Sequence, residues 1–212
     1  IDLIKRSAAV GNEVLVILAD VPSFGFRPRD VRNGLSIPPK MNFKNVFEIL
    51  KHPHWGLQTL VHGPPSFKSL VRYMPKRLNL EGLGQFMDLT FSGRLNEDRI
   101  AAIREQWRGK LVIKGIVSEE DTVKAINLGV DGLIVSNHGG RQLDAGQSSI
   151  MSMINLVKKY QKEITIMVDS GLRGGPDIAR AMASGAAFTF MGRSFMYGVG
   201  ALVNKEVIIV FL

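Results

Sequence analysis

The stretch KLVIKGIVSEEDTVKAINLGVDGLIVSNHGG, residues 110–140, predicts two buried strands joined by a helix. The apolar runs 110–116 and 132–137 are rich in Val and Ile, which is typical of strands in a covered sheet. Between them, Ser118 followed by Asp121 is a helix-capping pattern. Because apolar strands that alternate with helices indicate a parallel sheet, the chain is expected to be an α/β protein.

The same unit recurs on both sides of this segment. The pattern predicts further strands at 13–20, 165–170 and 187–193, and helices at 96–107, 149–161 and 176–185. Polar or glycine residues stand where four consecutive strands end: Lys114, Ser136 with His138, Asp169, and Gly192 with Arg193. A doubly wound sheet would gather some of these residues. A (β/α) barrel places every strand end on one face, where active sites form, so we favour the barrel.

A long segment rich in Pro, Gly and basic side chains, 23–88, interrupts the pattern within what we expect to be a single domain of residues 1–212. Between Arg27 and Asp88, ten Lys or Arg stand against four Asp or Glu, whereas the net charge of the whole chain is +8. The basic character is therefore concentrated in this insertion.

Two amphipathic fragments lie inside the insertion, at 42–51, where Asn42 is the expected cap, and at 65–74. A connection of this length is more typical of a folded lid than of a plain loop. The alternative is a solvent-exposed insertion without a function of its own. Its charge would also suit peripheral contact with an anionic membrane.

Composition excludes several classes of function. The chain has no Cys, which rules out disulfides, thiolate nucleophiles and cysteine metal sites. His52, His54 and His62 lack carboxylate partners at useful spacing, so no metal site is expected. The basic segment lacks aromatic residues interleaved at base-stacking spacing and any nucleic-acid-binding motif, so no nucleic-acid partner is expected. Neither a membrane-spanning run nor a signal-peptide pattern stands out, and we expect a cytoplasmic protein.

The residues at the strand ends form a candidate site for an anionic substrate. His138 is followed by two glycines, which allow close approach of a ligand, and by Arg141, whose planar guanidinium matches a carboxylate. Asp20 ends an upstream strand and could fix the tautomer of His138. Lys114 would place a fixed cation near developing charge.

Two glycine-rich turns, at 169–175 and 191–194, follow the last two strands of the repeat. Barrels commonly bind phosphate at this position through loop amides and an arginine. Arg173 and Arg193 would supply the positive charge.

At these residues the chain resembles the FMN-dependent alpha-hydroxy acid oxidases and dehydrogenases, which include glycolate oxidase, lactate oxidase and mandelate dehydrogenase. The segment SNHGGRQLD, residues 136–144, resembles the active-site signature of that family. Further segments are similar in the family's order: ADVPSFGFRPRDVRNG, LVIKG, DSGLRGG and MGRS. The resemblance covers most of residues 1 to about 200 and implies a (β/α)8 TIM barrel, here a partial barrel with strands four to eight.

The resemblance implies a role for each matching residue. His138 would be the base at the substrate's alpha-hydroxy carbon centre, supported by Asp20, while Arg141 and Arg27 would hold the substrate carboxylate. The residues implied to bind FMN are Lys114 near N1 and the C2 carbonyl, Ser136 at the isoalloxazine ring, Asp169 on the ribityl chain, and Gly171, Arg173, Gly192 and Arg193 toward the phosphate.

Three positions depart from the family pattern. Leu18 stands where the family has a threonine or a similar polar residue, which removes one hydrogen bond expected for FMN. The GLRGG turn lacks a second arginine, and Gln147 replaces a usual proline.

The resemblance implies an FMN-dependent oxidoreductase that converts an L-2-hydroxy acid such as lactate, glycolate or mandelate to the 2-oxo acid. Electrons would pass to oxygen, a quinone or another acceptor, and the intact enzyme would be a homo-oligomer. A non-catalytic remnant that binds a phosphate-bearing ligand or a partner is the alternative, since the first barrel strands are not seen. Another phosphate-binding barrel enzyme is a third interpretation.

Overall fold

A computed structural model of the chain describes residues 2–22, 28, 32–33, 43–63, 71–74, 86 and 95–202. Arg27, expected to help hold the substrate carboxylate, lies outside these residues. The chain divides into two compact units, Ile1–Gly25 with Gly93–Leu212 and Phe26–Ser92.

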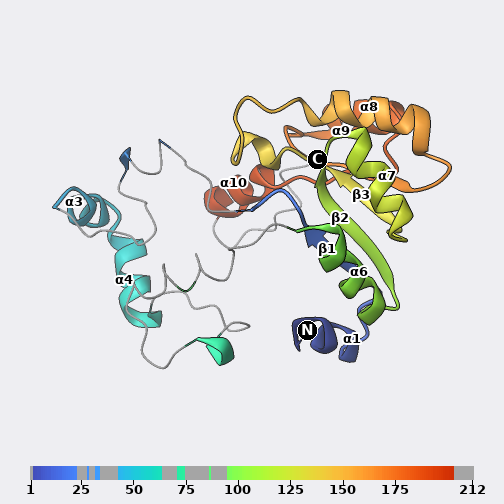
Figure 1. Ribbon diagram of the computed structural model, residues 1–212. Coiled ribbons are helices and arrows are strands. Elements are labelled where there is room, and N and C mark those ends of the chain that lie inside the picture. The colour runs from blue at the N-terminus through green and yellow to red at the C-terminus, as the bar shows by residue number, and fades with distance from the viewer. Residues whose placement is uncertain are drawn as a thin grey trace. The chain divides into compact units, whose positions relative to one another are not determined.

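The first unit is built on a parallel sheet of four strands with the order β1-β2-β3-β4 (Figure 1). The strands are β1 (Val14–Leu18), β2 (Lys110–Ile116), β3 (Gly132–Val135) and β4 (Thr165–Val168). Each strand pairs in parallel with the next one in the chain. This order is that of a (β/α) barrel, whereas the order reverses at the centre of a doubly wound sheet.

The predicted strand at 187–193 was wrong in its extent. It is reduced to a single parallel bridge between Val168 and Thr189. Backbone hydrogen bonds from Ala187 N to Ile166 O (2.8 Å) and from Phe190 N to Val168 O (2.9 Å) hold it beside β4. The order of the barrel therefore continues, but the paired stretch is too short to form a strand.

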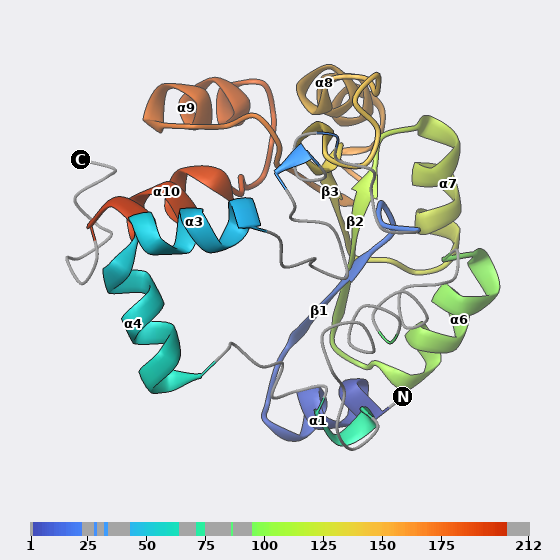
Figure 2. The ribbon, with the colours of Figure 1, turned by 90° about the vertical axis from the view of Figure 1, so that its left-hand side faces the viewer.

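Helices α6 (Glu97–Gln106), α7 (Glu119–Asn127), α8 (Ser149–Tyr160) and α9 (Gly175–Ala183) follow one another in an arc around the sheet (Figure 2). The Ser118 hydroxyl accepts a hydrogen bond from Asp121 N at 3.1 Å, which confirms the predicted cap of α7. The Asn96 side chain caps α6 by accepting from Arg99 N at 3.1 Å. Two helices flank this set, α1 (Asp2–Ala9) and α10 (Arg193–Leu202).

The hydrophobic core lies between the sheet and this arc of helices. Leu111, Ile113 and Leu133 from the central strands are fully buried, and Met153 of α8 packs into the same cluster. All four residues of β3 are buried, as expected for the covered centre of a parallel sheet.

Strand β1 is covered on one face. Leu15 and Ile17 pack against the core, whereas Val14, Val16 and Leu18 are each about half exposed. Among the described residues β1 pairs only with β2. An end strand with one apolar face exposed is what part of a closed barrel presents.

Asp131, the residue before β3, connects the start of β2 to helix α6. Its carboxylate accepts hydrogen bonds from Arg104 Nη1 (2.9 Å), Lys110 Nζ (2.8 Å) and Leu111 N (2.9 Å). Burial alone would raise the pKa of this carboxyl, but the hydrogen bonds from Lys110, Leu111 and Arg104 outweigh burial and leave the pKa below its usual value.

The second unit contains two short helices, α3 (Phe43–Lys51) and α4 (Pro53–His62), which contact each other. Helix α3 lies inside the fragment predicted at 42–51, while its expected cap, Asn42, lies outside the described residues. In the fragment at 65–74, the described end forms a 3₁₀ turn at Val71–Tyr73, and the rest lies outside the description.

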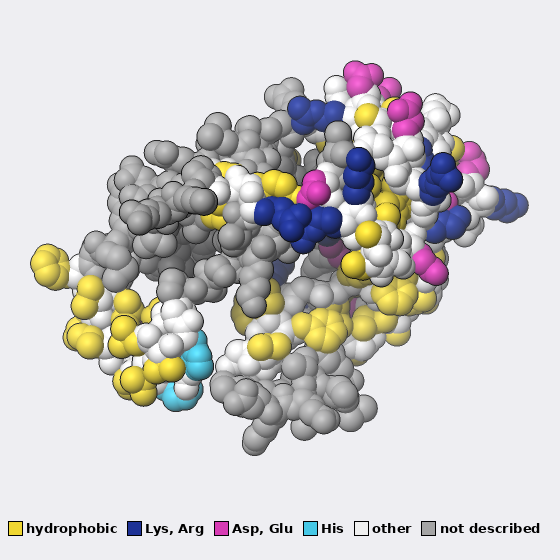
Figure 3. Space-filling model, turned by 90° about the horizontal axis from the view of Figure 1, so that it is seen from below, with side chains coloured by type: hydrophobic (Ala, Val, Ile, Leu, Met, Phe, Trp, Pro, Cys, Tyr) yellow, Lys and Arg dark blue, Asp and Glu magenta, His cyan; other side chains and the backbone are white. Residues whose placement is uncertain are grey.

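Apolar side chains project from both helices of the second unit. Exposed members are Phe43, Val46, Phe47 and Leu50 on α3 and Trp55, Leu57, Leu60 and Val61 on α4. Figure 3 shows them as a mainly hydrophobic surface at the left, with histidines beside it. In the described part of the chain, no helix has both the length and the apolar character needed to cross a membrane.

Candidate active site

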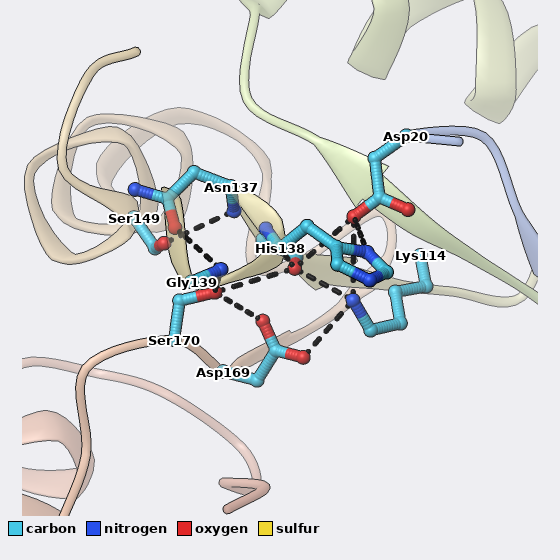
Figure 4. A network of polar contacts seen from close by, with 9 residues as sticks. Asp20, Lys114, Asn137, His138, Gly139, Ser149, Asp169 and Ser170 are labelled. Atoms are coloured by element: carbon cyan, nitrogen blue, oxygen red, sulfur yellow. Dashed lines mark hydrogen bonds and ion pairs between the residues drawn. The ribbon is translucent and has the colours of Figure 1, made fainter. Parts of the chain in front are cut away.

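The candidate site lies where the four strands end. Asp20 follows β1, Lys114 lies near the end of β2, and Ser136 and Asp169 directly follow β3 and β4. Because the strands are parallel and in sequential order, these four ends come together at one edge of the sheet. Figure 4 shows Asp20, Lys114, His138 and Asp169 grouped there.

Asp20 and His138 are direct neighbours. Asp20 Oδ2 lies 3.1 Å from His138 Nδ1, and the Asp20 side chain is only 9% exposed. The distance is that of an ion pair, but the angle does not meet hydrogen-bond geometry, and among the described residues His138 Nδ1 has no hydrogen-bond partner. At this distance the Asp20 carboxylate would form an ion pair with a protonated His138 ring.

Lys114 is the centre of the polar network. Its Nζ lies 3.3 Å from Asp20 Oδ2 and 3.1 Å from Asp169 Oδ2, and it donates a hydrogen bond to Ser136 Oγ at 2.7 Å. One ammonium group is therefore shared by two carboxylates from different strands. Its single positive charge partly compensates the two carboxylates and so lowers the cost of burying them.

His138 sits on a tightly held turn. Residues His138–Gly140 form the 3₁₀ turn η2, and His138 has a φ of 55°, in the left-handed region that Asn, Asp and His enter more readily than other side chains. The backbone N–H of His138 donates to Ser136 Oγ at 3.1 Å. The Asn137 side chain accepts from Gly139 N at 3.0 Å.

Ser170 joins this turn to the end of β4. Its hydroxyl accepts a hydrogen bond from Gly139 N at 3.0 Å and donates to Asp169 Oδ1 at 2.8 Å. Ser170 has a φ of 77°, so its backbone adopts a conformation that non-glycine residues rarely occupy.

Sequence reasoning missed three polar residues that hold the turn: Asn137, Ser149 and Ser170. Ser149 Oγ accepts from Asn137 N at 3.3 Å. For Asn137 and Ser170 a local signal existed, because Asn and Ser directly after a strand commonly form turns through their side chains. Ser149 lies twelve positions from its partner and carried no such signal.

A cavity of about 370 Å³ opens at this edge of the sheet. Most of the predicted site residues line it, namely Lys114, His138, Arg141, Asp169, Gly171, Arg173, Gly192 and Arg193. Asp20 and Ser136 are not in its lining, but they contact Lys114 and His138, which are. The structure thus brings every described member of the predicted site together.

Apolar side chains complete the cavity and were not predicted: Leu172, Phe190, Met191, Met196 and Tyr197. They lie beside the charged side chains of the lining, four cationic and one acidic, and beside two glycine turns. This combination suits a ligand with an apolar ring, a hydroxylated chain and a phosphate. The residues present therefore fit a flavin mononucleotide.

The two arginines of the glycine turns are placed differently. Arg193 is the first residue of α10, and its Nη2 donates to Gly139 O at 3.3 Å, so it contacts the histidine turn. Gly139 has a φ of 67°, a backbone conformation that favours glycine, and a Cβ there would also displace the guanidinium of Arg193, whose Nη2 would lie 2.6 Å away. Arg173 is held through its backbone, since its N–H donates to Asp177 and its carbonyl accepts from Ser194.

Comparison with known proteins identifies the family. The FMN-dependent dehydrogenase family matches residues 1–208. An L-lactate dehydrogenase of Haemophilus influenzae is 37% identical over 205 residues, which are 96% of this chain and 54% of that protein. An L-lactate dehydrogenase of Bartonella quintana is 33% identical over 207 residues, 97% of this chain and 54% of that protein.

Solved structures agree with this assignment. The monotopic membrane protein (S)-mandelate dehydrogenase superposes with a TM-score of 0.89 at 33% identity, over 99% of this chain and 55% of that one. A mandelate oxidase with bound (S)-2-phenylpropionate superposes with a TM-score of 0.66 at 27% identity, over 94% of this chain and 47% of that one.

The chain spans about half the length of the curated relatives that it matches. The matched residues nonetheless run through the whole sheet and all the described residues of the cavity. From the family match, the two relatives and the superposed structures together, this chain belongs to the FMN-dependent dehydrogenase family, which uses FMN as its cofactor.

Proposed function

We propose that the protein oxidises an L-2-hydroxy acid to the corresponding 2-oxo acid with FMN as the electron acceptor. The observation that carries this proposal is the convergence of His138, Arg141 and Lys114 on one cavity, with Asp20 directly behind His138. A base, a carboxylate-binding cation and a flavin-facing cation are the groups that this reaction requires.

His138 is the proton acceptor in this proposal. Because Nδ1 faces the Asp20 carboxylate, the proton of the neutral ring is favoured on Nδ1, which leaves the lone pair of Nε2 for the substrate. Oxidation removes two electrons and two protons from the hydroxy acid; His138 Nε2 would receive one proton, and FMN, when bound, would take up the two electrons with the other. Asp20 then stabilises the imidazolium that forms.

Arg141 positions the substrate. Its guanidinium lines the cavity three residues from His138 and makes no ion pair within the described ranges, so its donors are available for a carboxylate. A bidentate contact would fix the alpha carbon relative to His138. Arg27, a second predicted carboxylate ligand, remains a prediction from the sequence.

The remaining predicted residues would hold FMN. Lys114 and Ser136 would contact the ring, Asp169 the ribityl chain, and Arg173 and Arg193, with the turns at Gly171 and Gly192, the phosphate. When bound, FMN supplies the acceptor for the two electrons of the hydroxy acid.

Anaerobic reduction of the bound flavin tests the function. The purified protein is mixed with L-lactate, glycolate or (S)-mandelate, and absorbance in the flavin bands is followed. Bleaching by at least one of the three acids is expected. Bound flavin that stays oxidised with all of them would contradict the proposal, and a purified chain that takes up no flavin would favour the non-catalytic alternative.

The same absorbance measurement can identify the final electron acceptor. The reduced flavin is mixed with oxygen or with a soluble quinone, and the two reoxidation rates are compared. Much faster reoxidation by the quinone would identify a dehydrogenase rather than an oxidase.

We also propose that the second unit makes peripheral contact with an anionic membrane. On α3, the exposed side chains Phe43, Val46, Phe47 and Leu50 follow helical spacing and form one apolar stripe. An amphipathic helix of this kind in a basic segment can lie in the membrane interface. The structural similarity to a monotopic membrane protein supports this proposal.

Vesicle sedimentation tests the contact. Binding to phosphatidylglycerol-containing vesicles is expected at low salt, with weaker binding at high salt or to phosphatidylcholine alone. The variant Phe47→Glu with Leu50→Glu should lose binding. A matched control, Met151→Glu with Met182→Glu, changes exposed apolar residues of the first unit and should retain it. Equal sedimentation of the two variants would exclude α3 as the contact.

A further inference from the structure

The position of Asp20 depends on Gly115 of β2, next to which it packs. Gly115 has a φ of 105°, and the pairing of β2 with β3 shifts register between Lys114 and Ile116. A register shift with a glycine in a left-handed conformation is a β-bulge, a feature that re-aims side chains next to active sites.

The bulge changes which way the following side chains point. Ile113 and Ile116 are three positions apart, yet both lie in the hydrophobic core, which regular alternation along a strand does not allow. Lys114 between them faces the cavity. Because of the extra residue at position 115, Lys114 can face the cavity while Ile113 and Ile116 on either side of it both pack into the core.

Gly115 also leaves the space that Asp20 occupies. A Cβ at position 115 would lie 2.5 Å from Asp20 Cβ, 2.7 Å from Asp20 Cγ and 2.8 Å from Asp20 N. The adjacent backbone is fixed, because Ala19 N donates to Lys114 O at 2.8 Å. Asp20 could not retreat from such a Cβ without moving away from His138 and Lys114.

We infer that Gly115 is a positioning residue, whose missing side chain and left-handed bulge set the Asp20 carboxylate against His138 and Lys114. Its effect on catalysis rests on the proposed function, but its effect on packing does not. Any residue with a Cβ would push Asp20 out of the 3.1 Å contact with His138.

The test compares Gly115→Ala with Gly129→Ala. Gly129 has a φ of 70°, and the nearest atom to a Cβ there is Arg104 Cδ at 3.9 Å, so Gly129→Ala introduces left-handed strain without overlap. The midpoint of urea unfolding should fall more for Gly115→Ala than for Gly129→Ala. Equal decreases in the midpoint would mean that the overlap with Asp20 does not destabilise the protein.

A double-mutant cycle separates overlap from strain. Asp20→Gly removes Cβ and Cγ, the two nearest side-chain atoms, so the fall in midpoint caused by Gly115→Ala should be at least halved in the Asp20→Gly background. If Gly115→Ala does not fold alone, recovery of a folded double variant is the expected result. The same fall in both backgrounds, or no folding in either, would overturn the inference.

Kinetics provide a readout that a purely structural role would not move. Gly115→Ala should lower kcat on the order of tenfold or more with a much smaller change in KM, because Arg141 is untouched. In the Asp20→Asn background the same change should lower kcat little further. Equal losses in both backgrounds would show that Gly115 does not act through Asp20. If no 2-hydroxy acid is oxidised at all, the proposed function fails, and the unfolding cycle still decides the role of Gly115.

Discussion

His138 Nδ1 lies 3.1 Å from Oδ2 of Asp20. Asp20 follows β1 and His138 follows β3, so the two residues are distant in the sequence but lie at the same edge of the sheet. The carboxylate is almost completely buried and is shared with Lys114. In the proposed mechanism this carboxylate would orient the imidazole and compensate the charge that the ring acquires when it accepts a proton.

Asp20→Asn keeps the size of the side chain and removes its charge. We expect kcat to fall by about 10²-fold while KM changes much less, because stabilisation of the imidazolium is lost and the substrate carboxylate is held elsewhere. Steady-state kinetics normalised to flavin content measures this. Glu163→Gln, an exposed site at the end of α8, is the control. An unchanged kcat for Asp20→Asn would remove Asp20 from the mechanism.

His138→Asn separates chemistry from backbone strain. Asn tolerates the left-handed conformation of this position, so the free energy of unfolding should stay within about 0.5 kcal/mol of the wild type. Turnover should fall by roughly 10²–10⁴-fold, because the proton acceptor is gone. His138→Val should lose stability as well, by about 1–2 kcal/mol, since a branched side chain fits this φ poorly. Wild-type turnover in the Asn variant would identify a different base.

Arg173→Ala distinguishes phosphate binding from ring binding. We expect the Kd for FMN to rise on the order of 10- to 100-fold, because a charge-assisted contact with the phosphate is lost. The Kd for riboflavin, which lacks the phosphate, should stay unchanged. Quenching of flavin fluorescence measures both constants. Arg180→Ala, at an exposed arginine of α9, is the control, and equal weakening for the two flavins would contradict a phosphate role.

Asp131→Asn should make stability less dependent on pH. The pKa of Asp131 is lower in the folded protein than in the unfolded chain, so its contribution is present above the unfolded pKa and is lost as pH falls through the folded one. We expect Asp131→Asn to cost about 1–2 kcal/mol at pH 7, through weaker bonds to Arg104 and Lys110, and progressively less below about pH 4.

Urea unfolding of both proteins between pH 7 and pH 3 measures this difference. Glu120→Gln is the control. Its pKa is lowered by the hydrogen bond from Lys124, but the group is fully exposed, and its removal should change stability much less. A constant difference between wild type and Asp131→Asn across the range would show that the Asp131 charge does not stabilise the fold.

The sequence predicted the parallel α/β architecture because its signals are local. The apolar run of β3, the cap at Ser118 and the strand-end position of Asp169 each depend on a few neighbouring residues. The SNHGGRQLD segment indicated the family, because it resembles the family's active-site signature. The least accurate prediction was the last strand. Residues 187–193 pair with β4 through a single bridge, and the alternation of residue types does not determine how many residues of a strand will pair.

Only the tertiary structure decided how the site is held together. Ser136 and Asp20 are 116 positions apart, and their proximity depends on strand order and register rather than on either local sequence. Likewise, the contact of Ser170 with Gly139, the contact of Arg193 with the same turn and the space that Gly115 leaves for Asp20 join separate strand ends. Local sequence determines which residues end each strand, because strands and caps form from neighbours. Packing determines what those residues touch, because a shift of one residue in β2 would turn Lys114 away from the cavity.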